Sequence, residues 1–169
     1  MRNNYYITTP IYYVNDKPHI GHAYTSIACD IMARFKRLDG YNVKFLTGTD
    51  EHGQKVEKAA LAQNKTPLEY ANIISKDFRA LTKTLNLSND DFIRTTEKRH
   101  KIASESLWRK LFDNNHIYLS KYSGWYALRD EAFYSEKEIT NGKAPTGAEV
   151  TWVEEESYFF DLSKWQDQL

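Results

Sequence analysis

Cysteine is nearly absent from this sequence, since Cys29 is the single one among 169 residues. One thiol excludes an internal disulfide and a cysteine-rich zinc site, and it fits a reducing compartment, so we expect a cytoplasmic protein. Long apolar runs are absent as well. Because there is neither an apolar leader nor a stretch of about 18 apolar residues, we expect no secretory signal and no membrane partner.

Glycine and proline are scarce, with 7 and 4 residues, while hydrophobic residues make up 41% of the chain. This composition excludes collagen-like and low-complexity classes and is typical of a globular domain. Charge of one sign is not in excess, because 23 Lys and Arg balance 23 Asp and Glu. We therefore expect no DNA partner, and an RNA partner would need local contacts instead of a general attraction.

The first third of the sequence alternates between strand and helix patterns. Tyr5–Thr9 is β-branched and aromatic and predicts a buried strand, and 43–46 predicts a second one. Between them, residues 21–39 predict a helix whose apolar stripe faces a core. That stripe consists of Ala23, Ile27, Ile31, Phe35 and Leu38. A turn-rich loop at 48–53 then leads into a helix that ends near Gln63. This order predicts a parallel sheet.

The middle of the sequence continues the same α/β pattern. Thr66 and Glu69 form a capping box around Pro67, which predicts a helix that ends near residue 85. Residues 91–94 predict a short strand. Thr96 then caps a further helix that ends near residue 114, so residues 1–115 have an α/β pattern.

The remainder of the sequence has a different residue pattern. After His116, short aromatic runs alternate with turn residues, which predicts a mostly β segment. A second capping box at Ser163 starts a helix only a few residues before the sequence stops, so we expect a truncated chain. The candidates for a core of this segment are Trp125, Tyr126, Phe133, Tyr134, Trp152 and Tyr158.

Two histidines flank the start of the first predicted helix, in the tetrapeptide 19–22, His-Ile-Gly-His. Backbone N–H groups and the helix dipole favour an anion at this position, Gly21 allows close approach to the backbone, and two imidazoles can donate to phosphate oxygens. The tetrapeptide follows a strand end, where open α/β sheets bind their ligands. The arrangement predicts a nucleotide phosphate site, although two solvated histidines at a helix start are the simpler alternative.

Two other nucleotide-binding patterns are excluded. Residues 48–55 approach the phosphate-loop pattern, but Gln54 stands at its lysine position and Val56 has no hydroxyl for magnesium. A G-x-G-x-x-G dinucleotide fingerprint is absent from the sequence.

Four blocks in the same order resemble one family. Residues 8–22 (TTPIYYVNDKPHIGH), 45–53 (FLTGTDEHG), 91–97 (DFIRTTE) and the aromatic segment 122–134 resemble the class I aminoacyl-tRNA synthetases, and among them the methionyl-tRNA synthetases most. The resemblance covers nearly the whole chain. It implies a Rossmann-like parallel-sheet nucleotide-binding half-domain at 1–115 and, at 116–169, the beginning of an inserted mostly-β connective domain.

The resemblance also implies roles for individual residues. His19 and His22 would be catalytic, binding the ATP phosphates and stabilising the charge that builds on them, with Gly21 and Asn15 on the ATP side. Methionine would be held by the residues that match the family's amino-acid pocket, which are Pro10, Ile11, Tyr13 and Asp50. Asp50 would pair with the substrate ammonium, a role supported by its place after a second strand at the same sheet edge. A solvated turn acid is the alternative for Asp50, and the roles of Glu51 and His52 stay open.

The implied reaction is the ATP-dependent activation of methionine to methionyl-adenylate, with Mg2+ bridging the phosphates, followed by transfer to the 3′ end of tRNA(Met). The lysine-rich KMSKS loop of the family is missing from these residues, so we expect the chain to be inactive alone. Many relatives also carry Cys-x-x-Cys zinc knuckles where this sequence has 127–130 (ALRD) and 144–147 (APTG), so we expect no zinc and no metal-binding residues.

Two alternatives stay open at this point. A free-standing nucleotidyltransferase with the same histidine loop would use ATP without methionine. A non-catalytic binding module derived from the synthetase would keep the fold without the chemistry.

Overall fold

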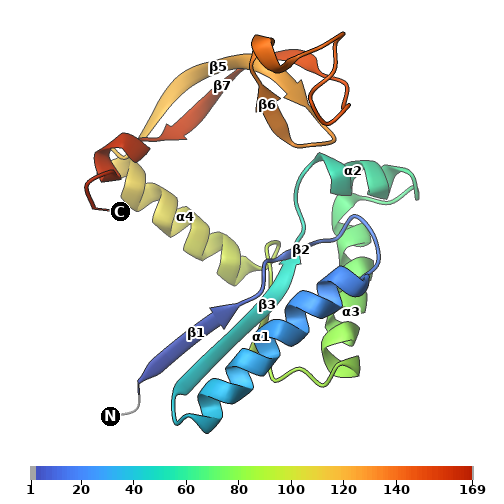
Figure 1. Ribbon diagram of the computed structural model, residues 1–169, viewed down its shortest axis with the longest axis vertical. Coiled ribbons are helices and arrows are strands. Elements are labelled where there is room, and N and C mark those ends of the chain that lie inside the picture. The colour runs from blue at the N-terminus through green and yellow to red at the C-terminus, as the bar shows by residue number, and fades with distance from the viewer. Residues whose placement is uncertain (1–2, 169) are drawn as a thin grey trace. The chain divides into compact units, whose positions relative to one another are not determined.

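The computed structural model describes residues 3–168 and is shown in Figure 1. The chain divides into two compact units between Ser104 and Glu105, within helix α4 (Lys98–Asp113). The assignment of residues 1–115 and 116–169 to two functional domains stays a proposal.

The first unit is built on a parallel sheet of β1 (Asn4–Thr8), β2 (Tyr12–Tyr13), β3 (Asn42–Asp50) and β4 (Asp91–Arg94). Strand β3 is central: it pairs with β1 along its first half, with β2 at its end, and with β4 along the opposite edge. The order β1–β3–β4 is that of the first half of a Rossmann-type sheet. The predicted α/β fold class is confirmed, and β4 has the predicted bounds.

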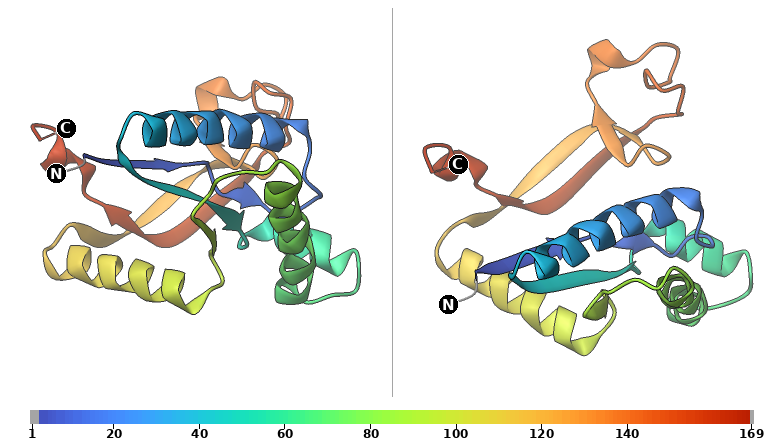
Figure 2. Two further views of the ribbon diagram at one scale, coloured as in Figure 1. Left: turned by 90° about the horizontal axis from the view of Figure 1, so that it is seen from below. Right: turned by 60° about the horizontal axis from the view of Figure 1, so that its bottom comes forward.

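Helices connect these strands. Helix α1 (Ile20–Leu38) covers one face of the sheet (Figure 2), and α2 (Gln54–Leu61) and α3 (Pro67–Thr84) pack on each other. The predicted capping box of α3 is present, because Glu69 N donates to Thr66 Oγ1 at 3.3 Å and Thr66 N donates to Glu69 Oε2 at 2.9 Å. The main apolar cluster joins β2, α2, α3 and β4 through Tyr12, Val14, Val56, Ala60, Tyr70, Ala71, Ile74, Phe78 and Phe92.

The apolar stripe of α1 does not face a core, which corrects the prediction from its spacing. Ile31 is 62% exposed and Leu38 is 88% exposed, whereas the buried residues of the helix are Ser26, Asp30 and Ala33. Small side chains let the helix lie close to the sheet. The burial of the Asp30 carboxylate is tolerated because Ser88 donates two hydrogen bonds to it at 2.6 Å each. The bulky residues therefore form an exposed stripe on α1.

Strand β3 extends through the segment that the sequence predicted as a loop. Gly48 is paired with Ile93 of β4, and a Cβ at this glycine would stand 2.1 Å from the Ile93 carbonyl oxygen. Only a glycine allows the two strands to approach this closely. The expected loop therefore begins after Asp50, three residues later than predicted.

The start of α4 differs from the prediction as well. The predicted cap, Thr96, donates its hydroxyl to the Glu51 carboxylate, and the first backbone bond of the helix is from Lys101 N to Glu97 O at 3.1 Å. A distant acid thus competes successfully for the hydroxyl that the local pattern assigned to the helix.

The second unit contains β5 (Ile117–Ala127), β6 (Ala132–Tyr134) and β7 (Thr151–Phe160) in an antiparallel sheet, with two short 3-10 turns, η1 (Glu136–Glu138) and η2 (Leu162–Trp165). Most of the short aromatic runs merge into the two long strands β5 and β7, and the run at 132–134 forms β6. Ser163 lies inside η2 and caps no α-helix, contrary to the prediction.

The expected aromatic core of this segment is also wrong. Phe133, Trp152 and Tyr158 are exposed, and the buried cluster of the second unit is Ala127, Ala144 and Ala148, on which Tyr134 and Val150 pack. The large rings pack on one another and on α4 instead of in a closed core: Tyr158 lies edge-on to Trp108 and Phe112, with ring centroids 5.6 and 6.2 Å apart, and all three stay half exposed. Across the described part of the chain, none of the helices has the length and apolar character that crossing a membrane requires.

Candidate functional site

The predicted site residues lie at the carboxyl ends of the parallel strands of the first unit. Pro10 and Ile11 follow β1, Tyr13 lies in β2, and Asp50 ends β3. Tyr13 and Asp50 are register partners, and Val14 N donates to the Asp50 carbonyl oxygen at 3.3 Å. Loops at this edge form the ligand site of open α/β sheets, so the topology brings these residues to the position where binding is expected.

His19 and His22 cap the start of α1 reciprocally. Gly21 N donates to His19 Nδ1 at 3.1 Å, and His19 N donates to His22 Nδ1 at 3.1 Å. The two rings stack with centroids 3.8 Å apart. This is a capping box built from imidazoles instead of a hydroxyl and a carboxylate.

The capping hydrogen bonds determine which ring nitrogens are available to a ligand. Because each Nδ1 accepts a backbone hydrogen bond, the proton of the neutral ring lies on Nε2 in both histidines. Burial, and then the charge of His19, lower the pKa of His22 below its ordinary value, so that ring is neutral near pH 7. The pair thus presents two N–H donors beside the amino end of a 19-residue helix, which suits an anion.

Aromatic packing fixes the His22 ring. Its centroid lies 4.7 Å from that of Tyr12 and 5.0 Å from that of Phe78, each edge-on. The Tyr12 hydroxyl is 2.9 Å from Ser26 Oγ on α1, and Tyr12 stacks on Phe78 at 5.5 Å. The start of α1 is therefore held against the main core, which preorganises the donors.

Gly21 has a different neighbour from the one expected. A Cβ at this position would lie 3.0 Å from His19 Cε1 and 3.1 Å from His19 Nδ1. The glycine is therefore needed for the His19 ring to fold back over the helix start. Room for a ligand above the backbone, which the sequence suggested, stays a prediction.

The remaining predicted residues offer exposed groups at this edge. Ile11 and Tyr13 are 40% and 38% exposed. The Tyr70 hydroxyl fixes the Asn15 carbonyl oxygen at 2.9 Å. Asp50 is half-buried, and within residues 3–168 its carboxylate has no hydrogen bond or ion pair.

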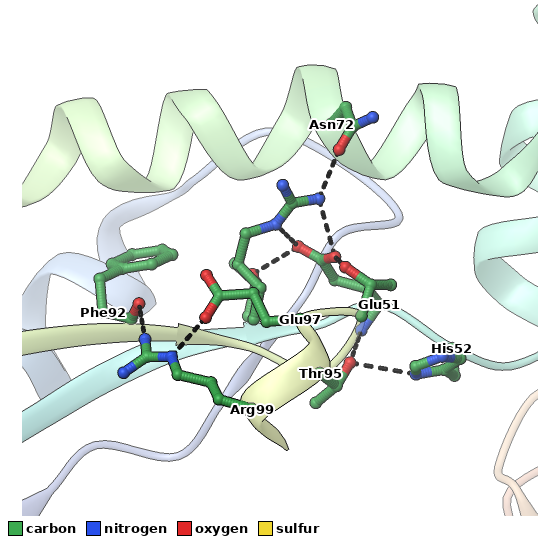
Figure 3. Close-up of polar contacts among 10 residues, drawn as sticks. Glu51, His52, Asn72, Phe92, Thr95, Glu97 and Arg99 are labelled. Atoms are coloured by element: carbon green, nitrogen blue, oxygen red, sulfur yellow. Dashed lines mark hydrogen bonds and ion pairs between the residues drawn. The ribbon is translucent and has the colours of Figure 1, made fainter. Parts of the chain in front are cut away.

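Sequence reasoning left Glu51 open, and the structure gives it a dense set of contacts (Figure 3). Its carboxylate receives hydrogen bonds from Thr49, Arg94 and Thr96, and its side chain is 0% exposed. Arg94 lies 43 residues further along the chain, so no local pattern could reveal the pair. His52, beside it, has Nδ1 at 3.1 Å from the Thr95 hydroxyl.

The two stretches that the resemblance aligns with zinc knuckles, 127–130 and 144–147, lie together in the second unit. Ala127 and Ala144 share the buried alanine cluster, and Asp130 accepts hydrogen bonds from Thr146 and, at 3.0 Å, from Tyr134. Within residues 3–168 there is no group of three or more His, Cys, Asp or Glu side chains that could hold a metal ion. The donor set of this corner is thus hydroxyls and one carboxylate, which does not fit a structural zinc site.

Comparisons with known proteins agree on one family. A family model described as tRNA synthetases class I (M) matches residues 5–153. The chain is 65% identical to a methionine–tRNA ligase of Rickettsia felis, over all of this chain and 33% of that protein. It is 52% identical to one from Bacillus subtilis, over 99% of this chain and 27% of that protein.

A solved structure gives the same result. Mycobacterium tuberculosis methionyl-tRNA synthetase in complex with methionyl-adenylate matches with a TM-score of 0.89 and 50% sequence identity, over 98% of this chain and 34% of that one. The chain therefore spans about a third or less of the length of the proteins that it matches.

Proposed function

Because the chain belongs to the family of class I tRNA synthetases (M), we propose that the intact protein containing it is a methionine–tRNA ligase. The observation that carries this proposal is that the stacked histidine cap of α1 and the Asp50 carboxylate, which has no partner within residues 3–168, stand at one edge of one parallel sheet. An anion site and a cation site at the same edge suit ATP and the ammonium of an amino acid.

On the ATP side, His19 and His22 donate their Nε2–H groups to phosphate oxygens, while the start of α1 adds its dipole. We assign Gly21 and Asn15 to the same side of the site. ATP enters as its Mg2+ complex, in which the metal bridges phosphate oxygens and belongs to the substrate. Donors already fixed by the cap need little reorganisation when charge develops on the phosphates.

On the methionine side, the Asp50 carboxylate pairs with the substrate ammonium. Pro10, Ile11 and Tyr13 surround the rest of the amino acid, and the Tyr13 ring packs on the thioether, a soft group that favours aromatic contacts. The exposure of Ile11 and Tyr13 supports this assignment, because a ligand would cover the apolar surface that they leave open.

The chemistry has two steps and needs no covalent enzyme intermediate. A carboxylate oxygen of methionine attacks the α-phosphorus of ATP, and pyrophosphate leaves with the electron pair of the broken P–O bond. A hydroxyl of the 3′-terminal ribose of tRNA(Met) then attacks the acyl carbonyl, and AMP leaves. The protein contributes orientation and electrostatic stabilisation. Since tRNA and ATP meet in the cytoplasm, we place the protein there.

The test is amino-acid-dependent ATP–pyrophosphate exchange by the intact protein. We expect exchange that requires methionine and falls at least about 100-fold in His19→Ala and in Asp50→Ala, while circular dichroism shows that both variants stay folded. Asp39→Ala, a surface acid at the other end of α1, serves as the control and keeps wild-type exchange. Exchange without methionine would support the nucleotidyltransferase, and folded protein without exchange would support the binding module.

A further inference from the structure

The carboxylate next to Asp50 is the most completely bonded acid of the described chain. Glu51 Oε1 accepts from Thr49 Oγ1 at 2.8 Å and from Arg94 Nε at 2.7 Å, and Oε2 accepts from Arg94 Nη2 at 2.9 Å and from Thr96 Oγ1 at 2.5 Å. A buried charge is tolerated only when it is paired and hydrogen-bonded in this way. The side chain therefore has one conformation available to it.

These bonds tie separate parts of the first unit to the end of β3. Arg94 ends β4, and its Nη2 also donates to Asn72 Oδ1 of α3 at 2.7 Å. Asn72 and Glu51 are labelled in Figure 3. Thr96 belongs to the turn after β4. The Glu51 side chain thus joins the end of β3 to β4, to the following turn and, through Arg94, to α3.

The backbone after Asp50 is held by the same turn. Glu51 N donates to Thr95 Oγ1 at 2.9 Å, and the same hydroxyl lies 3.1 Å from His52 Nδ1. On its other side, Asp50 is fixed by its pairing with Tyr13 and by the bond from Val14 N. The Asp50 side chain itself has no partner within residues 3–168. The position of its carboxylate therefore depends on the bonds that hold the backbone before and after it.

The charges lead to the same conclusion. Two adjacent acids would repel each other and would both attract a cation, but the Arg94 guanidinium is bidentate on Glu51 and compensates its charge. Asp50 is left as the acid of this edge that is available to a ligand. Removal of the Glu51 charge would leave Arg94 uncompensated close to that ligand.

We propose that Glu51, with Arg94 and Thr95, is a positioning residue that aims the Asp50 carboxylate and the His52 ring into the amino-acid site without touching the substrate. The proposal rests on the proposed function, because it gives Asp50 a ligand to receive. It assigns Glu51 and His52 the roles that the sequence left open.

The variants are chosen to separate positioning from general stability. Glu51→Gln removes the charge, Thr95→Val removes the hydroxyl at nearly constant shape, and Thr95→Ser keeps the hydroxyl. The matched control is Asp30→Asn, because Asp30 is another shielded acid with bonds from Ser88 and Arg34 but lies on α1 away from the strand ends.

The first measurement is methionine-dependent ATP–pyrophosphate exchange by the intact protein. We expect Glu51→Gln and Thr95→Val to raise the KM for methionine about tenfold or more with a smaller change in the KM for ATP. Thr95→Ser and Asp30→Asn should stay within about twofold of the wild type. An unchanged methionine KM in folded Glu51→Gln or Thr95→Val, or an equal rise in Asp30→Asn, would overturn the proposal.

A second measurement does not depend on the activity. Hydrogen–deuterium exchange mass spectrometry should show faster exchange in the peptide covering residues 49–53 of Glu51→Gln and Thr95→Val, by about tenfold, with no such change there in Asp30→Asn. Wild-type protein without exchange activity would refute the proposed function, and this readout would still decide the positioning role. Unchanged protection of residues 49–53 would refute that role.

Discussion

At the scale of single residues, the site depends on hydrogen bonds that fix donors before any ligand arrives. The reciprocal cap of His19 and His22 uses the Nδ1 atom of each ring for the backbone and leaves Nε2 for a ligand. The ion pair between the buried Glu51 carboxylate and Arg94 holds the Glu51 side chain, and we propose that it fixes the backbone after Asp50 as well. Preorganised groups of this kind stabilise developing charge without reorganisation when the reaction occurs.

The lowered pKa of His22 predicts a pH dependence of stability. Since the folded pKa lies below the ordinary value of 6.5, the unfolded state binds more protons as the pH falls below that value. The contribution of His22 is thus fully present above pH 6.5 and is lost as the pH falls through the folded pKa. Urea unfolding between pH 5 and 7.5 should show a steeper decline for the wild type than for His22→Gln. Equal slopes would contradict the shift.

At the scale of elements, the central strand β3 determines the site because it carries Asp50 and pairs with strands on both edges. Its close contact with β4 needs Gly48. Helix α1 adds the end that we propose binds the phosphates, and Asp30 links the helix to the loop before β4 through Ser88.

We therefore predict that Gly48→Ala causes a large loss of stability. The new methyl group would overlap the backbone of Ile93, which cannot move aside as a side chain can. We expect a cost of about 3 kcal/mol or more in the free energy of unfolding, the upper range for overpacking. Gly142→Ala in the second unit is the comparison for backbone strain without overlap, because its Cβ position is open but its φ of +72° costs any side chain about 1 kcal/mol. A Gly48→Ala protein with the wild-type urea midpoint would show that the strands lie further apart.

Much of this element scale could be predicted from the sequence. The capping box at Thr66, the strand at 91–94 and the place of His19 at a helix start are local patterns, and all three are present. The failures are long-range: which face of α1 is buried, and where the hydroxyl of Thr96 binds, depend on Ser88 and Glu51 far along the chain. The rings of the second unit stay exposed, against the expectation of a core, because aromatic composition alone does not tell how completely other elements cover a sheet.

At the scale of the whole molecule, the described chain leaves a strand edge unpaired and an apolar helix face exposed. Strand β1 pairs with β3 alone among residues 3–168, and the stripe of α1 formed by Ile27, Ile31, Phe35 and Leu38 is exposed. An open strand edge beside an apolar surface is a site for association.

Residues 1–169 expressed alone should therefore associate and should lack methionine-dependent exchange. We expect light scattering to report dimers or larger species at about 100 μM, and charged substitutions on the stripe, such as Ile31→Lys with Phe35→Glu, to reduce their mass. A monodisperse monomer would contradict the role of these surfaces. Exchange at the level of an intact synthetase would contradict the expected inactivity.

The central claim, that Asp50 receives the ammonium of methionine, is tested most directly by isothermal titration calorimetry of the intact protein. Methionine is compared with 4-(methylsulfanyl)butanoate, which lacks the amino group. The account predicts that the wild type binds methionine at least about tenfold more tightly than the analogue, and that folded Asp50→Ala loses this difference. Retention of the full preference for methionine by folded Asp50→Ala would contradict it.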